Sequence, residues 1–142
     1  MTRVREIMSR RPIVAAADTP ARDVVDMLYE HDIRHVPVVR DGSVVGVVSD
    51  RDLRNLIDPR DVGTVSVEGL LEIQRRPISE MMSSDVVSVT QDSDITKAAE
   101  LMVDHGVGSV LVIDSRTNHL EGIVSYTDIL KHLFEFRADR DS

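Results

Sequence analysis

The sequence predicts an α/β (α+β) fold in which one β-α-β-β-α unit occurs twice. The first observation is an internal repeat: residues 4–40 match residues 78–114, and residues 46–52 match residues 122–128 after a short insertion in a turn. The second is hydrophobic periodicity, because each copy combines short apolar runs, typical of strands, with an apolar stripe at helical spacing. Two copies of one supersecondary unit therefore account for most of the chain.

The composition limits the partners that the chain can have. Its formal net charge is -8, so its electrostatic field repels polyanions, and we expect neither a nucleic-acid partner nor a membrane partner. Cysteine is absent, which excludes disulfides, thiolate metal sites and cysteine nucleophiles. No apolar signal segment is present, and no apolar run approaches the roughly 20 residues that span a bilayer. A cytoplasmic protein is expected.

The first copy is expected to begin with a strand at residues 13–16. Asp18 and Thr19 then signal a helix, with Pro20 at its first helical position. Apolar runs at residues 36–39 and 44–48, separated by an Asp-Gly turn, predict a β-hairpin, and Ser49 opens a second helix. The first helix carries an apolar stripe of Ala21, Val24, Val25 and Leu28, and the second is expected to direct Leu53, Leu56 and Ile57 toward the core.

The second copy repeats these elements. Its first strand is expected at residues 86–89 and its hairpin at residues 110–113 and 120–124. Residues 92–94 signal the first helix, and Ser125 opens the second. The first helix carries Ile95, Ala98, Ala99 and Met102 as its stripe, and the second is expected to direct Ile129, Leu130 and Leu133 toward the core.

The repeat divides the chain into four parts. Residues 1–57 form the first copy, residues 58–77 a linker, residues 78–133 the second copy and residues 134–142 a charged C-terminal tail. The linker contains proline and glycine, with a short helix expected at Val67–Arg75. His31 and His105 fall at matched helix C-termini, where an imidazole suits the helix dipole.

A doubled motif carries the chemistry. Residues 46–52 read Gly-Val-Val-Ser-Asp-Arg-Asp, and residues 122–128 read Gly-Ile-Val-Ser-Tyr-Thr-Asp, each where a strand runs into a helix. Ser-x-x-Asp is a capping-box pattern, so stabilising the helix N-terminus is one role for it. A carboxylate at a helix N-terminus can also accept both hydrogen bonds of a vicinal diol such as a ribose. The two roles are compatible.

With these motifs in register, the chain resembles the CBS domain family, named for cystathionine β-synthase. The resemblance covers residues 4–133 apart from the linker, and it rests on residues 5–9 and 79–83, on the hairpin starts at residues 34–39 and 108–113, and on both Gly-to-Asp motifs. It implies two repeats packed as a pseudo-twofold pair, a homodimer, and a regulatory ligand that contains adenosine: AMP, ADP, ATP, S-adenosylmethionine or NAD. No catalytic cofactor is implied.

The resemblance also assigns roles to residues of both copies. The serine and aspartate of the motif would bind the ribose and phosphate side of the ligand, and apolar residues of the partner repeat would flank the adenine. One cleft would combine Ser49 and Asp52 with Val87 and Val107. The other would combine Ser125 and Asp128 with Ile13 and Ile33.

The two clefts differ in their basic residues. The position before the hairpin strand, which can carry a phosphate-binding basic residue in related proteins, is His35 in the first copy and Ser109 in the second. Arg51 lies beside Asp52, whereas the second copy has Thr127. We therefore expect the Asp52 cleft to prefer charged phosphates, and the Asp128 cleft either to bind more weakly or to select a less anionic ligand. Arg34 is a further phosphate candidate that could reach the second cleft, and a solvated strand end is the alternative role for Arg34 and His35.

The sequence lacks recognisable catalytic parts. Its histidines show no metal-ligand spacing, and there is no Walker loop, no GxGxxG and no GxSxG motif. We interpret the chain as a non-catalytic sensor that changes conformation on binding its ligand and signals through an effector protein that the sequence does not identify. A protein-interaction scaffold with vestigial clefts is the alternative, and an enzyme is the least supported interpretation.

Overall fold

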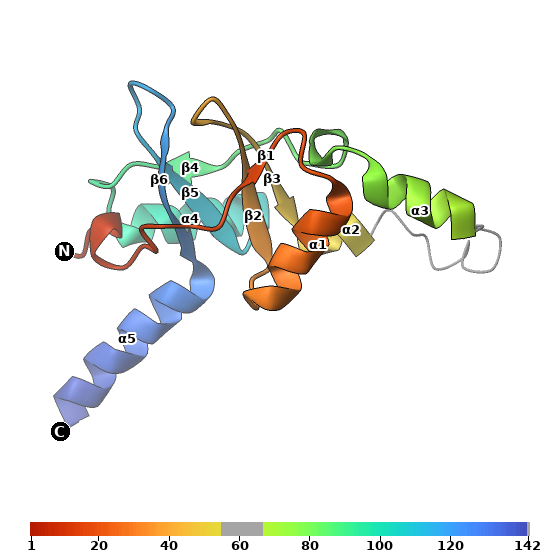
Figure 1. The fold of residues 1–142 in the computed structure, drawn as a ribbon. Coiled ribbons are helices and arrows are strands. Elements are labelled where there is room, and N and C mark those ends of the chain that lie inside the picture. The colour runs from red at the N-terminus through yellow and green to blue at the C-terminus, as the bar shows by residue number, and fades with distance from the viewer. Residues whose placement is uncertain (55–66, 142) are drawn as a thin grey trace. The chain divides into compact units, whose positions relative to one another are not determined.

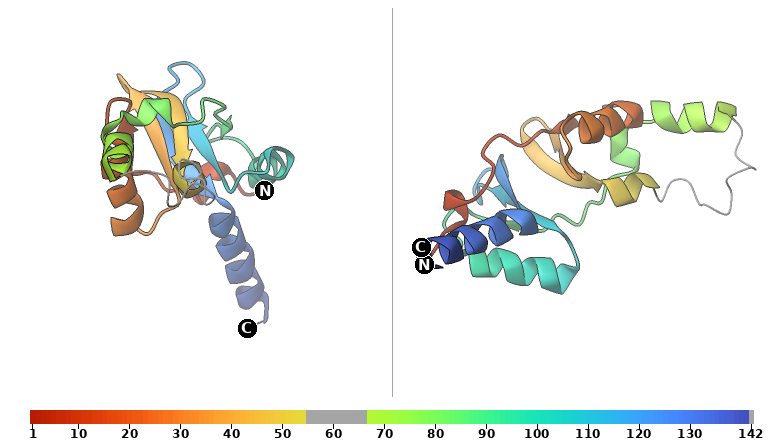
Figure 2. Two further views of the ribbon diagram at one scale, coloured as in Figure 1. Left: turned by 90° about the vertical axis from the view of Figure 1, so that its right-hand side faces the viewer. Right: turned by 90° about the horizontal axis from the view of Figure 1, so that it is seen from below.

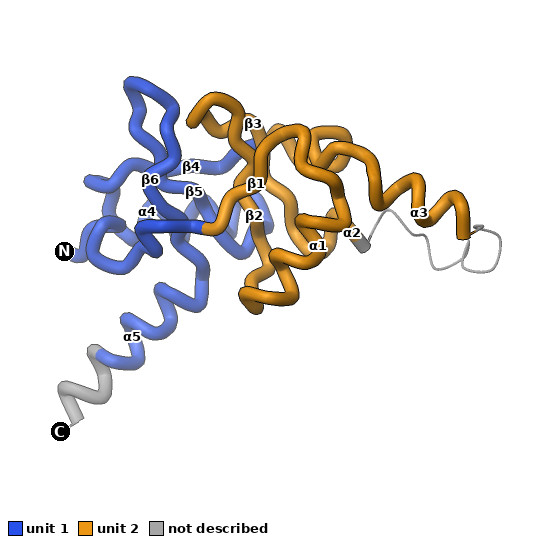
Figure 3. Tube along the Cα trace, in the orientation of Figure 1, with its two compact units in different colours: residues 1–12, 86–142 blue, residues 13–85 orange. Residues whose placement is uncertain are grey.

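The structure of the chain is a computed structural model that describes residues 1–54 and 67–141, with side chains described in residues 1–53 and 67–135. It divides into two compact units. Unit 1 contains Met1–Pro12 and Val86–Ser142, and unit 2 contains Ile13–Asp85 (Figure 3). Both units mix a small sheet with helices, so the predicted α/β fold class is confirmed.

Unit 2 contains the body of the first repeat. Its strands are β1 (Ala15–Ala16), β2 (His35–Arg40) and β3 (Ser43–Ser49), in the sheet order β1-β2-β3, with β1 parallel to β2 and β2 antiparallel to β3 (Figure 1). Asp41 and Gly42 both have positive φ, at 53° and 82°, as a tight Asp-Gly hairpin turn requires. The helices are α1 (Ala21–Glu30), α2 (Asp50–Arg54) and α3 (Val67–Arg75), and a 3₁₀ turn spans Ile78–Glu80.

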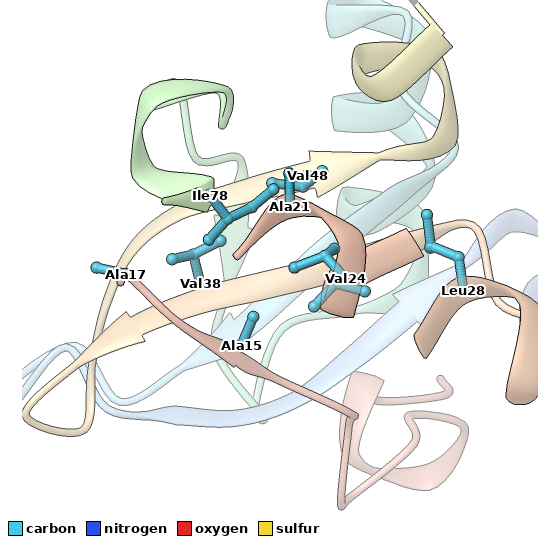
Figure 4. Close-up of a cluster of buried hydrophobic side chains, with 9 residues drawn as sticks. Ala15, Ala17, Ala21, Val24, Leu28, Val38, Val48 and Ile78 are labelled. Atoms are coloured by element: carbon cyan, nitrogen blue, oxygen red, sulfur yellow. The ribbon is translucent and has the colours of Figure 1, made fainter. Parts of the chain in front are cut away.

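The core of unit 2 is aliphatic. The predicted stripe of α1 packs on β2 and β3, with Ala21, Val24 and Leu28 buried against Val38 and Val48 (Figure 4). Leu53 of α2 packs partly against the same cluster, as predicted. Leu56 and Ile57, predicted to face this core, and residues 58–66 of the predicted linker lie outside the described residues. The predicted helix at Val67–Arg75 is present as α3.

Unit 1 contains the body of the second repeat. Its strands are β4 (Ser88–Val89), β5 (Ser109–Ile113) and β6 (Leu120–Ser125), in the order β4-β5-β6 with the same parallel and antiparallel pairings. A 3₁₀ turn spans Val4–Glu6, and the helices are α4 (Ile95–His105) and α5 (Tyr126–Asp141). Ala98 and Met102 of α4 are buried against Val110, Val112 and Val124 of the sheet. The two repeats therefore build the same sheet and core.

The leading segment of each repeat packs on the body of the other repeat. We define these leading segments as residues 1–12 and 76–85. Ser9 and Ile123 exchange two backbone hydrogen bonds, of 2.9 and 3.1 Å, and Ser83 and Val47 exchange another two, of 2.9 and 3.0 Å. Val4 is fully buried in the core of unit 1, and Ile78 is fully buried in the core of unit 2. The compact units are therefore not the sequence repeats, because each repeat lends its leading segment to the other.

These exchanged segments explain the glycine of the doubled motif. A Cβ on Gly46 would lie 2.8 Å from the carbonyl oxygen of Ser83, and one on Gly122 would lie 2.6 Å from that of Ser9. Real Cβ atoms do not approach a backbone oxygen so closely, so a side chain at either position would displace the leading segment. The glycine of Gly-x-x-Ser is thus a requirement of packing.

Several sequence predictions need correction. The first strands are shorter than predicted, since β1 and β4 begin after Ile13 and Val87. Pro20 is the N-cap of α1 and not its first helical residue, because its backbone is still extended, with ψ 145°. Leu130 and Leu133 do not face the core: they are 44% and 48% exposed, while Ile129 packs inward.

Helix α5 gives the reason for the exposure of these leucines. It continues to Asp141, through most of the predicted tail, and leads away from the sheet of its own unit, so the sheet does not cover its length (Figures 1 and 2). No helix among the described residues is long and apolar enough to cross a membrane.

Candidate functional site

The Ser-x-x-Asp motif of unit 2 forms the predicted capping box. Ser49 ends β3, and its backbone N–H donates to Oδ2 of Asp52 at 2.9 Å. The backbone N–H of Asp52 donates in return to Oγ of Ser49 at 3.1 Å. Two N–H groups at the start of α2 are satisfied by these bonds, and they hold the carboxylate of Asp52 at the positive end of the helix.

The motif of unit 1 forms the same box. The backbone N–H of Ser125 donates to Oδ2 of Asp128 at 2.9 Å, and that of Asp128 donates to Oγ of Ser125 at 3.2 Å. Among the described residues, Oδ1 of Asp52 and of Asp128 accepts no hydrogen bond. Both carboxylates are half-buried, so each unit positions an acceptor oxygen that a ligand hydroxyl can use.

A backbone hydrogen bond ties each box to the start of the hairpin. The N–H of Asp50 donates to the carbonyl of Arg34 at 3.0 Å, and that of Tyr126 donates to the carbonyl of Gly108 at 3.0 Å. The sheet register then places His35 opposite Ser49, and Ser109 opposite Ser125. His35 and Ser109, predicted to precede the hairpin strand, are instead its first residues, and each lies beside the Ser-x-x-Asp motif at one end of its sheet.

His35 and Ser109 occupy the same position in the two sheets but differ in their burial and in their chemistry. The His35 side chain is half-buried, and its desolvation lowers the pKa of the imidazole below the usual value of 6.5, although Asp50 and Asp52 act in the opposite direction. Arg34 lowers it further. The imidazole is therefore neutral at pH 7. Ser109 is only 9% exposed, so its hydroxyl is largely covered in the structure.

The remaining polar candidates also differ between the units. Arg34 and Arg51 are exposed in unit 2. In unit 1, the counterpart of Arg51 is Thr127, whose Oγ1 lies 2.7 Å from Oγ of Ser125. The Ser125 hydroxyl thus already has two partners, and no basic side chain accompanies it in the motif.

The four predicted adenine-flanking residues fall in both units. Ile13 and Ile33 belong to unit 2, and Val87 and Val107 belong to unit 1. Ile33 and Val87 pack partly against the cores of their own units, and Val107 is 38% exposed. Their role at an adenine ring, and their pairing with the Ser-x-x-Asp motifs, stay predictions.

Asp50 is a further charged residue of this site, with no role predicted from the sequence. Its carboxylate acts on His35 from the first position of α2, so it belongs to the electrostatic surroundings of this site. The signal was present in the motif itself, because Asp50 directly follows the Ser49 that pairs with His35. Within the parts of the chain that the structure describes, no group of histidine, aspartate and glutamate side chains could hold a metal ion.

The chain belongs to the CBS domain family. The family model of the CBS domain matches residues 4–59 and again residues 78–135, one match over each repeat. The resemblance seen in the sequence is thereby confirmed.

Two similar proteins are matched over most of their own length. The CBS domain-containing protein YhcV of Bacillus subtilis is 27% identical over 91% of this chain and 84% of its own length. The crystal structure of the protein named AcuB from Vibrio cholerae has a TM-score of 0.80 at 26% identity, covering 100% of this chain and 98% of that one.

A third similar structure contains ligands. The CBS domain pair of protein MJ0100, solved in complex with 5′-methylthioadenosine and S-adenosyl-L-methionine, has a TM-score of 0.77 at 25% identity and covers 96% of this chain and 98% of that one. Other relatives are longer, and the chain spans 46% of one matching protein from Methanocaldococcus jannaschii. CBS domain pairs are generally regulatory modules.

Proposed function

We propose that this protein is a non-catalytic regulatory module that binds an adenosine-containing ligand at its two Ser-x-x-Asp sites. The observation that carries the proposal is the doubled capping box, which fixes a half-buried carboxylate with an available oxygen at a helix N-terminus in each unit. A ribose diol needs an acceptor of this kind. The MJ0100 domain pair, similar in fold and 25% identical, binds adenosine compounds.

We propose further that the two sites prefer different ligands. His35 lies opposite Ser49 with Arg34 directly before it, and Arg51 lies within the motif, whereas the matching positions of unit 1 are Gly108, Ser109 and Thr127. A phosphate is recognised by charge-assisted hydrogen bonds, which are roughly twice as strong as neutral ones. The Asp52 site would therefore take a nucleotide such as AMP, ADP or ATP, and the Asp128 site a less anionic adenosine compound.

A thermal-shift series tests the proposed function. The purified protein would be heated with AMP, ADP, ATP, S-adenosylmethionine or NAD at millimolar concentration, with GMP and GTP as controls. A ligand at 100 times its Kd adds about 2.7 kcal/mol to the free energy of unfolding, a rise of several degrees for a chain of this size. We expect the shift with one or more adenosine ligands and not with the guanine controls. No shift with any of them would contradict the proposal.

We propose that the protein forms a homodimer through the outer face of α4 and α5. These two helices contact each other in unit 1, both carry exposed apolar side chains, and exposed apolar surface marks interaction sites. These side chains are Val103, Leu130, Leu133 and Phe134. Light scattering at micromolar concentration should give a dimer that Leu133→Glu together with Phe134→Glu disrupts. A monomer with and without ligand would contradict this.

The same apolar face favours the second candidate function, an interaction scaffold that binds another protein without any ligand. The two intact capping boxes do not distinguish the candidates, because they also stabilise helices. The thermal-shift series does distinguish them, since a scaffold responds to none of the adenosine ligands. In either case an effector protein carries the signal onward, and we place the module in the cytoplasm as part of the proposal.

A further inference from the structure

His35 lies beside the capping box of unit 2. It is the first residue of β2, and Ser49 of β3 is its partner across the sheet. Hydrogen-bonded and non-hydrogen-bonded residue pairs alternate along an antiparallel ladder. The backbone N–H of Asp50 donates to the carbonyl of Arg34, so Arg34 and Asp50 form a hydrogen-bonded pair. The neighbouring pair, His35 and Ser49, is therefore non-hydrogen-bonded. Side chains of such pairs lie closest, with Cβ atoms about 4.5–5.5 Å apart. A group bound at the Ser49 hydroxyl is thus within reach of the imidazole.

The imidazole is not committed to another partner within the described residues. No hydrogen bond to either ring nitrogen is present there, and no buried side-chain nitrogen or oxygen lacks a partner, so the ring nitrogens keep some contact with solvent. A half-buried imidazole without an internal partner can donate to a ligand oxygen. Its position, and not only its residue type, therefore suits ligand recognition.

The charged groups that act on His35 have opposite effects on its pKa. Asp50 and Asp52 of α2 favour its protonated form, and Arg34, which precedes it in the chain, disfavours that form. Burial outweighs the two carboxylates, and the net effect lowers the pKa of His35. The free site therefore holds a neutral imidazole next to carboxylates, and a proton there becomes favourable once an anion is added.

We propose that His35 recognises the phosphate of the ligand at the Asp52 site by taking up a proton from solvent as the phosphate binds. The inference rests on the proposed function and adds its regulation. The proton moves to a ring nitrogen, the imidazolium donates to a phosphate oxygen, and no covalent bond changes. The bound complex holds more protons than its separate components, so a fall in pH from about 8 toward 6 strengthens binding of a phosphate ligand. Binding of uncharged adenosine does not change in this way.

Unit 1 supplies the comparison within the same molecule. At the matched register position it has Ser109, which is largely covered and cannot titrate. Its Ser-x-x-Asp site therefore binds without proton uptake. The protein would then respond to pH through only one of its two sites.

Isothermal titration calorimetry tests the proposal. AMP methyl ester is the probe, because its phosphodiester charge is constant between pH 5.5 and 8, and adenosine is the uncharged control. Titrations at pH 7 in buffers of different ionisation enthalpy give the protons taken up on binding. We expect up to about one proton per phosphodiester bound. The Asp128→Asn background restricts the signal to the Asp52 site.

Variants assign the proton to this residue. His35→Ser and His35→Gln should both remove the uptake and flatten the pH dependence of Kd, while His105→Gln, at the exposed end of α4, should leave both unchanged. The glutamine variant keeps a hydrogen-bond donor of similar size, so it stays informative if the serine variant folds poorly. Proton uptake that persists in the glutamine variant would overturn this inference and leave the proposed function intact. Failure of AMP, its ester and adenosine to bind at all would overturn the proposed function as well.

Discussion

The Ser-x-x-Asp sites of the two units share their backbone and differ in their charges. Each has the same pair of capping hydrogen bonds and the same backbone bond between the helix start and the hairpin. Around this frame, unit 2 places Arg34, His35, Asp50 and Arg51, where unit 1 has Gly108, Ser109, Tyr126 and Thr127. The capping hydrogen bonds use the shared residues alone.

This difference separates two kinds of residue within one motif. Gly46, Ser49 and Asp52 are required by packing and capping, and so are their counterparts in unit 1. Arg34, His35, Asp50 and Arg51 beside them are exposed or half-exposed and contribute little to the core, so these positions can differ between the units. A duplicated fold can in this way keep one architecture and still distinguish two ligands.

The largest effect is expected from the shared glycines. Gly46→Ala and Gly122→Ala each force a Cβ against a backbone carbonyl of a leading segment, and overpacking of this kind costs about 1–3 kcal/mol. Urea denaturation monitored by circular dichroism measures the loss. Gly106→Ala is the control, because a Cβ there meets nothing within 4 Å and only the positive φ of 63° is strained. A loss confined to one of the two motif glycines would break the structural equivalence of the units.

The next largest effect is expected on AMP affinity, from the basic residues that unit 2 has and unit 1 lacks. The triple variant Arg34→Gly, His35→Ser and Arg51→Thr gives unit 2 the side chains of unit 1 at these positions. AMP should bind at least about 10-fold more weakly, because each charge-assisted hydrogen bond is worth about 1.5–3 kcal/mol. Adenosine should bind within about 2-fold of the wild type. Calorimetry with both ligands measures the difference, and an equal loss for adenosine would mean that the variant damages the site in general.

A smaller effect is expected at the capping serines. Ser49→Ala and Ser125→Ala remove the hydroxyl that accepts from the N–H of Asp52 or Asp128, at a cost of about 1 kcal/mol each. Thermal unfolding without ligand should show similar losses for the two variants. If Ser125→Ala costs clearly less, the Thr127 hydroxyl, which lies next to Oγ of Ser125, has replaced the lost acceptor.

The smallest effect is the pH dependence of stability. Because the pKa of His35 is lowered in the folded state, the unfolded chain binds more protons as the pH falls through 6.5. The free energy of unfolding therefore decreases over this interval, down to the folded-state pKa. The His35→Ser variant should lose less stability than the wild type between pH 7.5 and 5.5. Parallel urea midpoints for the two proteins would contradict the lowered pKa.

The local fold was largely predictable from the sequence, because each signal acts over a few residues. The Asp-Gly turn, the stripe of α1 and both capping boxes were predicted from short patterns, and all are present. The exchange of the leading segments was not predicted. It depends on which sheet Val4 and Ile78 reach, and two repeats of similar sequence offer both of them nearly equivalent apolar surroundings.

The orientation of α5 and the protonation state of His35 could not be predicted from the sequence either. Leu130 and Leu133 have the spacing of a buried stripe, but both are exposed on a helix that leads away from the sheet. The residue type of His35 indicated a basic group for a phosphate, whereas burial leaves the imidazole neutral in the free protein. Desolvation depends on the tertiary environment, which a single sequence does not describe.

The most direct test of the account is a calorimetric titration of AMP into the Asp52→Asn and Asp128→Asn variants. Asparagine can still accept the capping hydrogen bond from the serine N–H, so each variant keeps its helix start while losing the carboxylate charge and one of its acceptor oxygens. We expect Asp52→Asn to remove the tighter AMP site and Asp128→Asn to retain it. Loss of AMP binding in Asp128→Asn, with binding intact in Asp52→Asn, would contradict the account.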